Sequence, residues 1–127
     1  MLDHIGLCVS DLERARDFYL TALAPLGSTI AMEVSAAETG DKAHIGFGPT
    51  GKPQFWISEG KVAAPVHVGF SSATRAQVDA FHKAALAAGG RDNGAPGLRP
   101  HYHLDYYAAF VLDPDGHNIE AVCHRPE

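Results

Sequence analysis

The spacing of apolar and polar residues changes along the chain, and each change marks an expected element of structure. Residues 2–9 are mostly apolar and include β-branched side chains, which favours a strand, whereas apolar side chains in 11–24 recur at helical spacing. Three short apolar segments, 28–35, 43–48 and 53–58, follow between Gly and Pro turns and are typical of strands. The first half therefore predicts the element order βαβββ.

The second half repeats this order. Residues 66–71 predict a strand, and 75–88 carry apolar side chains at helical spacing before the stop signal Gly-Gly. Strands are expected near 106–113 and 117–124, joined by the turn sequence Asp-Pro-Asp-Gly. The segment 91–104 is rich in Gly and Pro, which predicts a long loop with a short strand at most.

Helix starts are marked by two capping-box patterns. Ser10 is followed three residues later by Glu13, and Thr74 is followed by Gln77. We expect Ser10 and Thr74 to be the N-caps of the two helices.

An internal repeat relates the two halves. His4-Ile-Gly-Leu aligns with His67-Val-Gly-Phe, and the same register matches further Phe, Ala, Leu and Gly positions along both predicted helices. The chain therefore predicts one α+β domain, residues 1–127, made of two βαβββ modules of about 1–64 and 65–127. We expect the free faces of the modules to form a curved, partly open mixed sheet around a central cavity, with the helices outside.

Composition narrows the class of protein. The 127 residues are 46% hydrophobic and 20% charged, as in an ordinary globular domain. A formal charge of −5 with no basic cluster argues against a nucleic-acid partner. No apolar run is long enough to span a membrane, and no secretory signal is visible at the start, so we expect a cytoplasmic protein.

Histidine is the unusual residue, with eight in the chain. His4 and His67 hold the same position in both modules, and Glu120 lies among apolar neighbours in a predicted strand, where an unpaired carboxylate is costly to bury. Two imidazoles and one carboxylate suit a divalent metal ion such as Zn, Ni, Mn, Co or Fe(II). We expect the repeat symmetry to bring the two imidazoles towards a common axis.

A polar segment, residues 99–107, precedes the strand near 106–113 and is a candidate for substrate contacts at the mouth of the cavity. Its histidines suit acid–base chemistry, Arg99 suits an anionic substrate group, and its tyrosines suit the pocket wall together with Trp56. The candidates for catalysis are His101, His103 and Glu120, and those for substrate binding are Trp56, Arg99, Tyr102 and Tyr106.

Two stretches resemble the vicinal oxygen chelate superfamily, which includes glyoxalase, bleomycin-resistance, fosfomycin-resistance, epimerase and extradiol-dioxygenase proteins. They are DHIGLCVSDLERARDFY, residues 3–19, and FVLDPDGHNIEAV, residues 110–122. The resemblance covers essentially the whole chain and implies a glyoxalase-like fold, a small-molecule substrate and a homodimer. Whether modules pair within one chain or across two is left open.

The resemblance places the family's metal ligands on His4, His67 and Glu120, with a fourth on the last strand of the first module. Gln54 is our candidate for the fourth, although aligning the turns places Phe55 opposite Glu120. The implied function is a metal-dependent lyase or isomerase that chelates vicinal oxygens and stabilises an enediolate-type intermediate. The alternatives are a metal-free small-molecule binder resembling bleomycin-resistance proteins and a single-domain dioxygenase.

Overall fold

The computed structural model describes all 127 residues and contains two βαβββ modules. The elements of the first module are β1 (Ile5–Val9), α1 (Leu12–Leu23), η1 (Ala24–Leu26), β2 (Thr29–Val34), α2 (Ala36–Thr39), β3 (His44–Gly48) and β4 (Phe55–Glu59). Those of the second are β5 (His67–Ser71), α3 (Arg75–Ala87), β6 (Arg91–Leu98), β7 (Tyr107–Leu112) and β8 (Asn118–Cys123). The predicted element order is confirmed.

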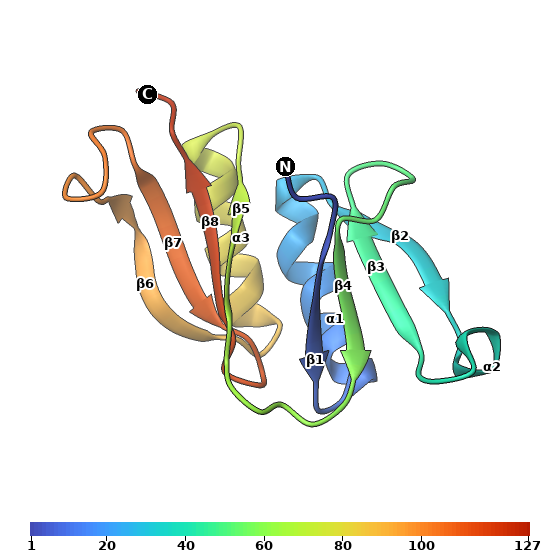
Figure 1. The fold of residues 1–127 in the computed structure, drawn as a ribbon. Helices are drawn as coiled ribbons and strands as arrows, with labels where there is room; N and C mark the ends of the chain where they lie inside the picture. The colour runs from blue at the N-terminus through green and yellow to red at the C-terminus, as the bar shows by residue number, and fades with distance from the viewer.

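Each module forms its own four-stranded mixed sheet, in the order β1-β4-β3-β2 and β5-β8-β7-β6. The first strand of each module pairs in parallel with the last, and the remaining neighbours are antiparallel. In Figure 1 the two sheets lie side by side with β1 and β5 at the centre, and α1 and α3 lie together on one side. The α+β class is confirmed, and the sheets are not closed into a barrel.

One hydrophobic core lies between the helices and the sheets. It joins apolar side chains from both modules, because α1 packs against α3 as well as against its own sheet. The alternation along the central strands follows from this cover: Leu7 and Val9 on β1 are buried against α1, whereas His4 and Gly6 lie on the opposite face. The helix-free face of each sheet therefore carries the candidate functional residues.

Polar contacts hold the two modules together. The hydroxyl of Tyr19 on α1 donates to Asp113 in the turn between β7 and β8, at 2.5 Å. His117 in the same turn faces the Cys8 carbonyl of β1 at 2.9 Å through Nε2, and its Nδ1 accepts from the Val66 N–H. Ser10 bonds Asp115 through both its N–H and its hydroxyl. These bonds fix how the modules sit in one chain.

Two local expectations were wrong. Residues 91–98 form the long edge strand β6, not a loop, because bulges at Gly94 and Gly97 absorb the irregular residues and an edge position tolerates Pro96. The N-cap of α1 is Asp11, whose carboxylate accepts from the Arg14 N–H, while the Ser10 hydroxyl bonds Asp115. The Thr74 capping box is confirmed, with both of its bonds present.

Candidate functional site

The second module holds an imidazole and a carboxylate side by side. Nε2 of His67, at the start of β5, lies 3.0 Å from Oε1 of Glu120 on the neighbouring strand β8. Only 4% of the Glu120 side chain is exposed, and its other oxygen, Oε2, accepts from the Tyr106 hydroxyl. Burying a carboxylate in this way requires partners on both oxygens.

The hydrogen bond of His67 Nδ1 limits the state of its Nε2. Its Nδ1 lies 3.0 Å from the Asn118 carbonyl, which only accepts, so Nδ1 carries a proton. A neutral imidazole then turns the lone pair of Nε2 towards the Glu120 carboxylate, and both groups are acceptors. Either the ring carries a second proton or a cation is shared by the two groups. The donor atoms here fit a divalent metal ion.

The first module presents its own imidazole in a similar way. Nδ1 of His4 lies 2.8 Å from Asp3 Oδ1, so it donates to the carboxylate and leaves the Nε2 lone pair free. Lys52 Nζ holds the second oxygen of Asp3 at 2.5 Å. Hydrogen bonds from Lys52 and His4 lower the pKa of Asp3 from 3.8 to about 2, so this carboxylate stays charged.

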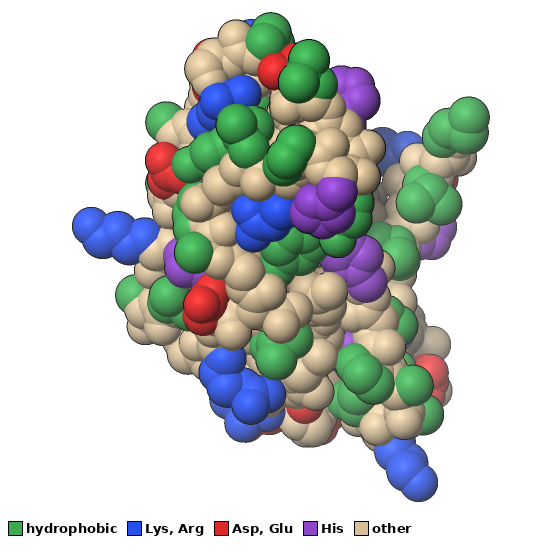
Figure 2. All heavy atoms as spheres, turned by 90° about the vertical axis from the view of Figure 1, so that its left-hand side faces the viewer, with side chains coloured by type: hydrophobic (Ala, Val, Ile, Leu, Met, Phe, Trp, Pro, Cys, Tyr) green, Lys and Arg blue, Asp and Glu red, His purple; other side chains and the backbone are tan.

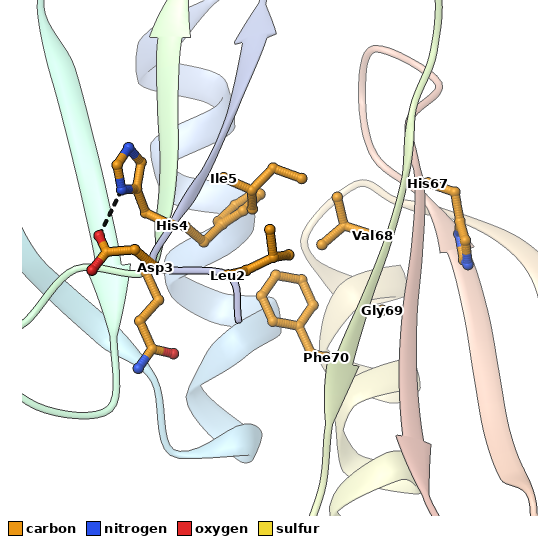
Figure 3. A pocket seen from close by; sticks show the side chains of 10 residues that line it. Leu2, Asp3, His4, Ile5, His67, Val68, Gly69 and Phe70 are labelled. Atoms are coloured by element: carbon orange, nitrogen blue, oxygen red, sulfur yellow. Dashed lines mark hydrogen bonds and ion pairs between the residues drawn. The ribbon is translucent and has the colours of Figure 1, made fainter.

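The two imidazoles do not meet within one chain. Figure 3 shows His4 and His67 pointing in opposite directions, with apolar side chains between them. A cavity of about 360 Å³ separates them and is lined by residues that include Leu2, Ile5, Val68 and Phe70. No three potential ligands of the His, Cys, Asp or Glu type come together anywhere in the chain. The expected convergence is therefore wrong within one chain, where the two imidazoles line the same cavity but point away from each other.

Strand register decides which residue of the first module corresponds to Glu120. Gly69 on β5 pairs with Glu120, and the equivalent Gly6 on β1 pairs with Trp56. The counterpart of Glu120 is thus Trp56, and the turn-based alignment of Phe55 with Glu120 was wrong by one residue. Phe55 is buried in the core. Gln54 lies one position before it, on the same sheet face as Trp56.

Arg99 lies folded over the open face of the second sheet. Its guanidinium donates to the carbonyls of Gly97 and Ala95, each at 2.8 Å, and its Cζ lies 5.5 Å from the centre of the Phe110 ring. Phe110 also stacks on His67 at 6.2 Å and pairs with Glu120 in the sheet. Arg99 uses two of its five N–H donors in these bonds and is in no ion pair.

Tyr106 lies in an aromatic cluster with Tyr102 and His101. Tyr102 packs on Tyr106 at 5.1 Å, and His101 packs on Tyr102 at 4.2 Å. Burial and the bond to Glu120 raise the pKa of Tyr106 from 10.0 to about 12, so its hydroxyl stays protonated. His101 and His103 are exposed. Figure 2 shows several His side chains on one face of the molecule, among scattered Lys and Arg.

Several contributing residues were not singled out by their sequence pattern. Asp3 orients His4, and Asn118 orients His67. The ring of Phe110 packs against both His67 and Arg99. Asp3 directly precedes His4, which is the one local signal available. His44 also lines a cavity together with Trp56.

Comparison with known proteins places this arrangement in a family. The model of the Glyoxalase/Bleomycin resistance protein/Dioxygenase superfamily matches residues 1–121. The chain belongs to this superfamily. The search of curated proteins gives no match.

Solved structures support the assignment of the fold. A glyoxalase/bleomycin resistance protein from Albidiferax ferrireducens is 30% identical, with a TM-score of 0.76 and 97% of each chain covered. A glyoxalase I mutant from Zea mays is 20% identical, with a TM-score of 0.73; 95% of this chain covers 46% of that one. A fosfomycin resistance protein from Listeria monocytogenes, complexed with Mn(II) and 1S,2S-dihydroxypropylphosphonic acid, is 19% identical, with a TM-score of 0.68. The match covers 96% of this chain and 88% of that one. The last two likenesses concern the fold alone.

The helices of this superfamily member are short. None is both long and apolar enough to pass through a membrane.

Proposed function

We propose that this chain is a metal-dependent lyase or isomerase that binds vicinal oxygens of a small-molecule substrate. His67 and Glu120 of one chain and His4 of a second copy would hold the divalent cation. The observation that carries the proposal is the 3.0 Å contact between His67 Nε2 and the buried Glu120, because Nδ1 of the ring already donates elsewhere. The matching bond from His4 to Asp3 supports the same use of the first module.

A second copy is part of the proposal because one chain keeps its two half-sites apart. The buried bonds from Tyr19 and His117 hold the modules in their side-by-side arrangement. Facing the first module of one copy with the second module of another would bring His4 opposite His67 and Glu120. A twofold dimer then has two equivalent sites.

Each group has a distinct part in such a site. A divalent cation held there would supply Lewis-acid stabilisation of negative charge on the substrate oxygens. Tyr106 holds Oε2 of Glu120, and the free donors of Arg99 are placed to bind an anionic substrate group. Glu120, His101 and His103 are the candidates for the base that moves a proton, and Tyr102 for a wall of the substrate pocket. Gln54 is the least supported ligand candidate, because Trp56 holds the register position of a fourth ligand.

Subunit complementation tests the proposal. His4→Ala and Glu120→Gln chains, each with a different affinity tag free of histidine, are co-expressed and the mixed dimer is isolated. Because one of its two sites would contain both substitutions and the other neither, we expect about half the wild-type metal content in the mixed dimer. Each variant alone is expected to bind no metal. Elemental analysis after metal reconstitution gives the stoichiometry.

Two outcomes would contradict the proposal. Wild-type protein that stays metal-free after reconstitution would exclude the metal-dependent function. A mixed dimer without metal, beside a metal-loaded wild type, would exclude a site shared in this way. The first outcome would favour the alternative of a metal-free small-molecule binder, which the cavity next to Trp56 also supports.

A further inference from the structure

Trp56 forms one wall of a cavity in the first module. The cavity has a volume of about 430 Å³ and is lined by His4, Gly6, Val34, Thr39, His44 and Trp56. It is therefore lined both by His4, whose Nε2 is free, and by the single tryptophan of the chain. None of its lining residues carries a carboxylate, so it favours an apolar occupant or one with donor oxygens for the metal.

The indole ring is held flat on the sheet. A Cβ atom at Gly46 on β3 would lie 3.0 Å from two atoms of the six-membered ring of Trp56, Cε3 and Cη2, so the absent side chain makes room for one ring face. The same Cβ would lie 2.6 Å from Pro53 Cβ, which shows that Pro53 closes the space beside the ring. The ring of His44 is nearly perpendicular to the indole, with ring centres 6.4 Å apart. The other face of the half-buried Trp56 ring lies towards the cavity.

The position of Trp56 relates the indole to the metal ligands. Gly6, its partner across the β1–β4 pair, lies two residues after His4 on the same face and places no side chain between them. Trp56 also occupies the register position that Glu120 holds in the second module. The first module thus provides a flat aromatic surface where the repeat would provide a carboxylate.

We infer that Trp56 selects substrates with a planar aromatic group bonded next to the oxygen pair that binds the metal. The inference rests on the proposed function for the position of the oxygen pair. An aromatic ring stacked on the indole face gains contact energy beyond the burial of its area. A saturated ring of the same size gains the burial alone.

Mandelate is a suitable probe because it joins a phenyl ring to a 2-hydroxy carboxylate. Its matched controls are hexahydromandelate, which has a cyclohexyl ring, and lactate, which has no ring. Since Trp56 is the only tryptophan, its fluorescence on excitation at the red edge reports directly on this cavity. We expect mandelate to shift the emission saturably and to bind about tenfold more tightly than lactate and about threefold more tightly than hexahydromandelate.

Two variants separate stacking from general loss of structure. In Trp56→Leu, calorimetry should show nearly equal affinity for mandelate and hexahydromandelate. Gly46→Ala keeps the indole but displaces it, so the preference should fall while the tryptophan remains. Met32→Ala removes an exposed apolar side chain of β2 that does not line the cavity, and should keep the wild-type preference.

The outcomes distinguish this inference from the proposed function. Metal-loaded protein that binds mandelate and hexahydromandelate equally, or a Trp56→Leu variant that keeps the wild-type preference, overturns the inference and leaves the metal site standing. A protein that binds no metal but retains the aromatic preference, lost in Trp56→Leu, supports the selection of aromatic groups by Trp56 and overturns the proposed function.

Discussion

The hydroxyl of Tyr19 donates to the carboxylate of Asp113 at 2.5 Å, and both side chains are almost completely buried. Tyr19 lies on α1 of the first module, whereas Asp113 begins the β7–β8 turn of the second. Asp113 also accepts from the backbone N–H groups of Asp115 and His117, each at 2.9 Å. One carboxylate therefore shapes the turn and joins the modules at the same time.

Removing the Tyr19 hydroxyl should destabilise the chain. Tyr19→Phe keeps the buried ring but leaves one acceptor site of Asp113 unfilled, which costs about 1–3 kcal/mol of the free energy of unfolding. Urea unfolding followed by circular dichroism measures this loss. The matched control is Tyr107→Phe, whose hydroxyl bond to Asp79 is exposed and should contribute less. Equal losses in the two variants would contradict a special role for the junction.

The same bond predicts a pH dependence. Burial, and then the charge of Asp113, raise the pKa of Tyr19 well above its usual 10.0. Above pH 10 the unfolded chain releases the phenol proton while the folded chain keeps it, so the free energy of unfolding falls as the pH rises. Tyr19→Phe should therefore lose less stability between pH 10 and higher pH than the wild type does. A wild-type slope in the variant would assign the alkaline loss to other groups.

His117 is the second buried contact between the modules. It lies 2.9 Å from the Cys8 carbonyl through Nε2 and accepts from the Val66 N–H at 3.1 Å, so it links β1 to the residue before β5. His117→Ala leaves a cavity and two backbone groups without this partner, and should cost about 2–4 kcal/mol. Thermal unfolding measures this loss, with His101→Ala as the control. Because His101 is exposed, its variant should have a free energy of unfolding within about 0.5 kcal/mol of wild type. A near-neutral His117→Ala would show that water replaces both bonds.

Tyr106 should matter for metal affinity more than for folding. Its hydroxyl holds one oxygen of Glu120 while His67 contacts the other. Partners that orient a metal ligand typically change affinity about 10- to 100-fold when they are removed. We expect Tyr106→Phe to bind metal at least about tenfold more weakly in competition with a chelator. Tyr102→Phe is the matched control, because that side chain is exposed; unchanged affinity in both would assign Tyr106 to the substrate pocket instead.

The repeat made the modules and the positions of His4, His67 and Glu120 readable from the sequence, because strand periodicity fixes which face a side chain takes. Periodicity does not say which part of the other module that side chain will face. The outcome depends on the side-by-side packing of β1 and β5 and on buried bonds such as Tyr19 to Asp113, which link distant residues. The strand β6 escaped prediction for a related reason, since bulges are decided by pairing with β7.

The register of Trp56 leads to a final prediction. Because Gly6 pairs with Trp56 as Gly69 pairs with Glu120, Trp56→Glu places a carboxylate at the position equivalent to Glu120. If His4 is a metal ligand, this added negative oxygen donor on the neighbouring strand should strengthen divalent metal binding by about tenfold or more. Trp56→Gln, which adds a neutral oxygen donor of similar size, should strengthen it less, and Trp56→Phe should not. Chelator competition gives the order of affinities. Equal metal affinity in the Glu, Gln and Phe variants would show that this position does not face the cation, and would also count against His4 as a ligand.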